Sequence, residues 1–134
     1  MSTPTYLPAL GRLLIALIFI LSGLSKIAAP ANTIAYIQSA GTPFAPAAFA
    51  VAAIVEVIGG LTLLVGFQTR LVAAALAIFT LAAAVLFHNN MADQNQMIHF
   101  MKNLAITGGL LQVIAFGPGA FSLDNRRRSA SVPA

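Results

Sequence analysis

Apolar residues in this chain gather into four long stretches that are almost free of charge, and polar residues fill the intervals between them. The stretches are residues 7–27, 45–67, 71–87 and 99–116. A helix that crosses a bilayer needs about 20 apolar residues, each adding about 1.5 Å of rise. The pattern therefore predicts an all-α fold, an integral membrane four-helix bundle whose neighbouring helices run antiparallel.

The connections between the stretches refine this prediction. In the first connection Ile34 and Ile37 lie three residues apart and Gly41 follows, which predicts a short interfacial helix over residues 32–40 in the first outer loop. The second connection, residues 66–70, is so short that it predicts a hairpin of spans two and three.

The end of the chain differs in composition from the rest. Gly117-Pro118-Gly119 stops the fourth span, and the residues beyond it are small, polar and basic. We expect a single four-span membrane domain over residues 1–124, followed by a basic, flexible cytoplasmic tail over residues 125–134.

Composition agrees with a membrane protein. Of the 134 residues, 59% are hydrophobic and only 7% are charged, whereas soluble domains carry about 25% charged residues. The chain has no cysteine, which excludes disulfide exchange, thiolate catalysis and iron–sulfur ligation by its own side chains.

The basic residues predict the orientation in the membrane. Arg12, Arg70 and Arg126–Arg128 fall at one end of the spans, and Lys26 and Lys102 fall towards the other. Loops rich in Lys and Arg stay in the cytoplasm, so both termini are expected on the cytoplasmic side of a bacterial inner membrane. We expect Arg12 to extend to the lipid head groups, and the arginine tail to anchor beside anionic lipid rather than bind nucleic acid.

A few ionisable residues interrupt the apolar spans, and these are the candidates for function. Glu56 lies eleven residues from Phe67, or about 16 Å along a helix, close to the midplane. Lys26, His88 and Lys102 fall in the outer half of the other three spans. An ionisable group at the centre of a spanning helix costs about 2.5–3.5 kcal/mol even on the lower scales. The four groups are therefore expected to meet inside the bundle.

Helical spacing adds three polar residues to this cluster. Ser22 shares a helix face with Lys26, and His99 and Asn103 share one with Lys102. The predicted site therefore comprises Ser22, Lys26, Glu56, His88, His99, Lys102 and Asn103, under an apolar rim of Phe19, Phe87 and Phe100.

Two interpretations of the cluster stay open. It is either an ion-pair lock that fixes the bundle or an outward-facing pocket that binds a quinone-like or other small amphipathic molecule. In the pocket, Lys or His donates to a carbonyl and Glu or His accepts a proton. No metal site and no built-in cofactor are predicted; a quinone is the expected ligand.

Three motifs, taken together, resemble a known family. They are RLLIALIFILSGLSK over residues 12–26, EVIGGLTLLVGFQTR over residues 56–70, and HFMKNLAITGGLL from residue 99 followed by GPGAFSLD over residues 117–124. In this order and spacing they are similar to the DoxX family of small four-span bacterial membrane proteins, and the likeness covers residues 7–124.

The resemblance implies a four-span inner-membrane protein connected with redox chemistry, since the family takes its name from a small subunit of a thiosulfate:quinone oxidoreductase. Other relatives are linked with oxidative or electrophile stress, often as partners of enzymes. The family's characteristic polar positions carry over to Lys26, Glu56, Arg70, His88 and Lys102.

Whether the chain is itself an enzyme stays open; if it is, the resemblance implies a quinone-linked oxidoreductase subunit. Besides a ligand-binding protein, two alternatives remain. One is a non-catalytic membrane subunit that docks a soluble oxidoreductase, and the other is a small transporter formed by self-association.

Overall fold

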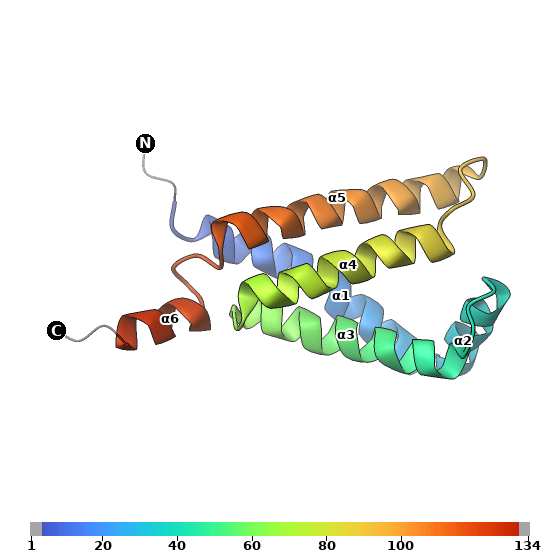
Figure 1. The fold of residues 1–134 in the computed structure, drawn as a ribbon, viewed down its shortest axis with the longest axis horizontal. Helices are drawn as coiled ribbons and strands as arrows, with labels where there is room; N and C mark the ends of the chain where they lie inside the picture. The colour runs from blue at the N-terminus through green and yellow to red at the C-terminus, as the bar shows by residue number, and fades with distance from the viewer. Residues whose placement is uncertain (1–3, 132–134) are drawn as a thin grey trace.

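The computed structural model describes residues 4–131 and is entirely helical (Figure 1). Its helices are α1 (Leu7–Ala28), α2 (Pro30–Ser39), α3 (Ala45–Val65), α4 (Thr69–Phe87), α5 (Gln94–Phe116) and α6 (Leu123–Ala130). Helices α1, α3, α4 and α5 are long and apolar enough to cross a membrane. The prediction of an all-α fold with four membrane-length helices is confirmed.

The bounds of the spans differ from the prediction by one residue at the end of α1, which is Ala28, and by two or more residues at three other places. Helix α5 begins at Gln94 rather than at residue 99, because the Asp93 side chain accepts a hydrogen bond from Gln96 N at 2.9 Å and caps a polar first turn. Helix α3 ends at Val65, since Gly66 turns the chain in a left-handed conformation. Helix α4 begins at Thr69 instead of residue 71.

The four long helices run alternately between two ends of the molecule (Figure 1). The start of α1, the α3–α4 turn and α6 lie at one end, which we call the basic end because it carries Arg12, Arg70 and Arg126–Arg128. Helix α2 and the α4–α5 connection lie at the other, which we call the open end. Helix α1 packs mainly on α3, and α4 mainly on α5.

Small side chains let the helices approach in the basic half of the bundle. The buried core there is formed by Ala16, Phe19, Leu63, Ala73, Leu76, Ala77 and Leu110. Gly60 is required where α3 crosses α1, because a Cβ atom on it would lie 2.7 Å from Ile20 Cγ1 and 3.2 Å from the Ala16 carbonyl oxygen. Close contact through small residues is the usual basis of helix association in membranes.

Helix α2 confirms the short helix expected between the first two spans. It begins at Pro30 and ends at Ser39, two residues before Gly41. Its Tyr36 ring stacks on Phe87 with 5.8 Å between centroids, and Tyr36 Oη donates to the Phe87 carbonyl oxygen at 3.5 Å. These two contacts hold α2 against the C-terminal end of α4.

Arg12 corrects one prediction, because it does not extend to the lipid surface. It is only 2% exposed and donates to the carbonyl oxygens of Leu63 and Leu64, each at 3.1 Å, and to that of Phe121. Carbonyls freed at the end of α3 and in the α5–α6 connection thus accept from both terminal nitrogens of the guanidinium, while its buried Nε has no hydrogen-bond partner. A Cβ on Gly66 would overlap Arg12 Nη1, and the backbone there is left-handed, so glycine is required.

Part of the tail expected over residues 125–134 is helical. Residues 123–130 form helix α6, whose first turn is capped by Ser122 Oγ accepting from Asn125 N at 3.1 Å. Asp124 lies in the first turn of α6, near the positive end of the helix dipole, and Arg127 and Arg128 lie in the last turn, near its negative end. Both placements stabilise the helix. Residues 132–134 lie outside the described part.

Asp124 also explains why α4 begins early. Its carboxylate accepts hydrogen bonds from Gln68 N and Thr69 N, each at 2.8 Å, and from Thr69 Oγ1 at 2.6 Å. Burial favours the neutral acid, but these hydrogen bonds and the charge of Arg127 outweigh it and lower the pKa of Asp124 below its usual value. A residue 55 positions away therefore caps α4.

Candidate functional site

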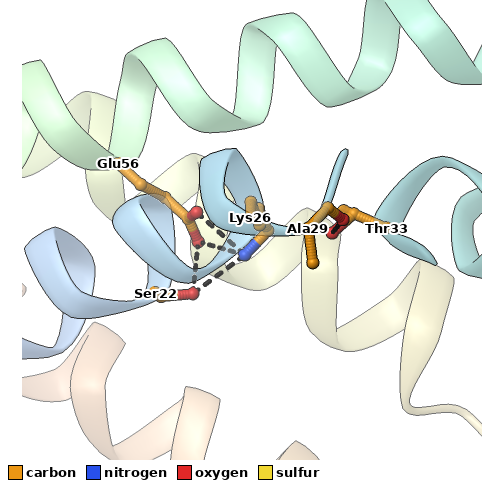
Figure 2. A network of polar contacts seen from close by, with 5 residues as sticks. All are labelled: Ser22, Lys26, Ala29, Thr33 and Glu56. Atoms are coloured by element: carbon orange, nitrogen blue, oxygen red, sulfur yellow. Dashed lines mark hydrogen bonds and ion pairs between the residues drawn. The ribbon is translucent and has the colours of Figure 1, made fainter. Parts of the chain in front are cut away.

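The centre of the candidate site is an ion pair between α1 and α3 (Figure 2). Lys26 Nζ lies 2.9 Å from Glu56 Oε2 and donates to Glu56 Oε1 at 3.1 Å. Ser22 Oγ donates to Glu56 Oε1 at 3.1 Å, and Lys26 Nζ lies 2.8 Å from Ser22 Oγ. Glu56 is only 6% exposed, so its charge is compensated by the amine rather than by solvent.

The ion pair forms part of the wall of a cavity of 920 Å³ in the open half of the molecule. Helices α1 to α5 all contribute to the wall, which is mostly apolar. Every residue of the predicted site lines this one cavity: Ser22, Lys26, Glu56, His88, His99, Lys102 and Asn103.

The predicted residues differ in how they are held. Lys26 is the salt-bridge partner of Glu56 in the described residues 4–131, while Lys102 lines the cavity from α5 and is exposed. Asn103 Nδ2 donates to the Thr80 carbonyl oxygen of α4 at 3.5 Å. Lys102 is thus the amine left available for a ligand.

The two histidines form a pair between the ends of α4 and α5. The rings of His88 and His99 stack with 5.0 Å between centroids, and His88 Nδ1 lies 3.1 Å from Gln96 Oε1. Within residues 4–131, no three acidic or histidine side chains lie close enough to hold a metal ion. The pair therefore offers ring nitrogens at the cavity wall for hydrogen bonds.

Two buried oxygen atoms on cavity-lining residues lack a hydrogen-bond donor: Glu56 Oε2 and Thr42 Oγ1. Glu56 Oε2 is close to Lys26 Nζ, as an ion pair, but the angles do not make a hydrogen bond. Buried polar atoms are nearly always paired in proteins. Both atoms are buried but belong to residues of the cavity wall, so a rotation of either side chain would present an unpaired oxygen to a polar group in the cavity.

Sequence reasoning missed part of the wall. Thr33, Tyr36 and Thr42, from α2 and the turn after it, line the cavity; the polar residues of the predicted short helix were the available signal. Phe19 and Phe87 line the cavity as expected, but Phe100 is not among its lining residues, because α5 presents His99, Lys102, Asn103 and Ile106 instead.

The fold and the cavity define a class of protein: a four-span membrane bundle with a polar cluster on the wall of an otherwise apolar cavity. Residues 7–89 match the profile of the DoxX family. The chain belongs to the DoxX family.

Two curated relatives place the protein in a membrane. The inner membrane protein YqjF of Escherichia coli K12 is 42% identical over 113 residues, which are 84% of this chain and 85% of YqjF. The inner membrane protein YphA of the same organism is 35% identical over 122 residues, or 87% of each chain. No solved structure matches the chain. The protein is a multi-pass protein of the bacterial inner membrane.

Proposed function

We propose that the cavity binds a small amphipathic molecule with a quinone-like head group, and that the protein serves a membrane redox or stress-response process through this ligand. The observation that supports the proposal best is the gathering of all seven candidate polar residues around one apolar cavity. Pockets for small molecules combine an apolar lining with a few converging polar groups in this way.

Each polar group has a role that follows from its surroundings. The Lys102 ammonium, which is exposed in the cavity, donates to a quinone carbonyl. Glu56 Oε2 and Thr42 Oγ1, which lack donors, accept hydrogen bonds from the hydroxyls of a reduced, phenolic head group. Lys26 and Ser22 hold the Glu56 carboxylate in place, and the histidine pair exchanges protons with the open end.

The proposal is tested by titrating purified protein with a short-chain benzoquinone. Glu56→Gln keeps the size of the side chain but removes its charge, and Lys102→Met removes the free amine. Each substitution is expected to weaken binding about tenfold, the effect of losing a hydrogen bond to a charged group. Gln112→Leu is the matched control, because Gln112 is exposed on α5 away from the cavity. Unchanged affinity in both site variants would reject the site.

A second candidate function, a subunit that docks a soluble oxidoreductase, is supported by helix α6. Its arginines Arg126, Arg127 and Arg128 are all exposed and stand on an ordered helix. Such a helix offers an acidic partner a fixed basic surface. Changing the three arginines to serine while retaining α6 would release an enzyme that co-purifies through this surface; an enzyme that remains bound would argue against docking here.

We further propose that the basic end faces the cytoplasm, because Lys and Arg accumulate on that side of inner-membrane proteins. The cysteine-free chain allows a clear test. A cysteine introduced at Ala92, in the α4–α5 connection, should react in intact cells with a thiol reagent that cannot cross the inner membrane, whereas one at Ser131 should not. The reverse labelling would overturn the orientation.

A further inference from the structure

We propose that the cavity opens to the lipid between α1 and α5, and that its ligand carries a long apolar tail that lies along this opening. The inference rests on the proposed function and narrows the ligand class. The ligand is a molecule dissolved in the membrane that enters sideways, with its head group at Lys102 and Glu56, rather than a compact molecule that enters from the aqueous side.

The first observation is a row of leucines on α1 that both line the cavity and face outwards. Leu14, Leu17 and Leu21 contribute to the cavity wall, and they are 62%, 41% and 62% exposed. From this large accessible surface on cavity-lining side chains we infer that the row lies at the edge of an opening. Because α1 spans the membrane, this opening faces hydrocarbon.

The second observation concerns where α1 and α5 approach each other. A Cβ on Gly109 would lie 3.2 Å from Ile15 Cδ1, so the two helices are close at that level, in the basic half. Towards the open end, α5 lines the cavity with Ile106, Asn103 and Lys102, opposite the α1 leucines. The helices therefore converge at the level of Leu14 and Ile15, at the basic end of the leucine row, and the cavity separates them from there towards the open end.

The third observation distinguishes this side from the opposite side of the bundle. Val51 of α3 and Leu86 of α4 are also exposed and line the cavity, but Tyr36 stacks on Phe87 and bonds to its carbonyl oxygen on that side. Between α1 and α5, the described residues 4–131 make no hydrogen bond, ion pair or ring contact. Separating α1 from α5 therefore breaks no polar or aromatic contact in the described part of the chain, whereas opening the opposite side breaks the contacts of Tyr36 with Phe87.

The length of the leucine row on α1 indicates how long the apolar tail of the ligand is. Twelve residues separate Leu14 from Lys26, which is about 18 Å along a helix. A tail of that length reaches from the ion pair well into the hydrocarbon, parallel to the spans. A ligand with such a tail meets apolar side chains along its whole length and polar groups only at its head.

Two leucines of α1 provide a matched test. Leu21 and Leu24 are both half or more exposed on the same helix, at 62% and 50%, but only Leu21 lines the cavity. Each is changed to tryptophan, and affinities are measured for a benzoquinone with a long alkyl tail and for the same benzoquinone without it. Leu21→Trp is expected to weaken the tailed quinone about tenfold, as crowding of a packed site does. It should leave the tailless quinone within about twofold, and Leu24→Trp should affect neither.

Photolabelling gives a second, independent measurement on the unaltered chain. A tailed quinone whose diazirine stands at the end of the tail is expected to label α1 near Leu14 and Leu17. Labelling at Val51 or Leu86, or equal effects of Leu21→Trp on both quinones, would overturn the lateral opening while the head-group site at Glu56 remained supported. If neither quinone binds the unaltered protein, the proposed function and this inference both fail.

Discussion

Lys26 joins α1 to α3 by its ion pair with Glu56, at 2.9 Å, on the wall of a cavity rather than in a closed interface. The sequence allowed two interpretations, an ion pair that fixes the bundle and a pocket that binds a ligand. The observed geometry is compatible with both at once. The pair fixes two helices, and the same carboxylate keeps a buried oxygen atom without a hydrogen-bond donor on a residue of the cavity wall.

The first prediction tests whether the ion pair of Lys26 and Glu56 stabilises the bundle. Lys26→Met leaves Glu56 as an uncompensated buried charge and should lower the free energy of unfolding in detergent by about 3–5 kcal/mol. Adding Glu56→Gln to Lys26→Met removes that charge and should restore most of the loss. If the double variant is no more stable than Lys26→Met alone, the pair does not control stability.

The second prediction concerns Arg12. Its guanidinium holds three carbonyl oxygens at the basic end, so Arg12→Ala should cost about 3 kcal/mol of unfolding free energy. It should also make the α5–α6 connection susceptible to proteolysis. Arg128→Ala, at an exposed position of α6, is the control and should change neither property. Equal behaviour of the two variants would contradict the burial of Arg12.

The third prediction compares two glycines. A Cβ on Gly60 would meet Ile20 and the Ala16 carbonyl, so Gly60→Ala should destabilise the bundle by about 1–3 kcal/mol. Gly108 has no heavy atom within 4 Å of the corresponding position. Gly108→Ala should therefore be neutral, or stabilising by up to about 1 kcal/mol, because alanine favours helix. Thermal unfolding in the same detergent measures both changes.

The fourth prediction is a pH dependence at the basic end. Because the pKa of Asp124 in the folded protein lies below its usual value of 3.8, the charged carboxylate stabilises the fold above that pH. This stabilisation is lost as the pH falls through the lower, folded pKa. Loss of such a helix cap costs about 1 kcal/mol. The stability difference between Asp124→Asn and the unaltered protein should therefore be largest near neutral pH and narrow below 3.8; a difference that does not change with pH would contradict this role.

The spans were predictable from sequence because length and hydropathy alone determine which helices suit a bilayer. The gathering of Lys26, Glu56 and Lys102 around one cavity also followed from physics, since hydrocarbon excludes charge that protein does not shield. Whether each residue acts on a ligand remains a prediction.

The contacts that sequence could not predict are those between distant segments. Arg12 was expected at the lipid surface because its carbonyl partners lie 51 to 109 residues away and carry no side-chain signal. The cap of α4 is likewise distant in sequence, because Asp124 lies 55 positions after Thr69. Backbone acceptors and long-range caps leave no periodic pattern in the sequence. The basic end of the bundle was therefore the hardest part to predict.

The most direct test of the central claim is a structure of the protein in lipid, determined after addition of a tailed benzoquinone. We predict elongated density in the cavity, with its polar end within hydrogen-bond distance of Lys102 or Glu56 and its tail between α1 and α5. A cavity that stays free of quinone at saturating concentration, or that closes as α1 packs against α5, would contradict the account.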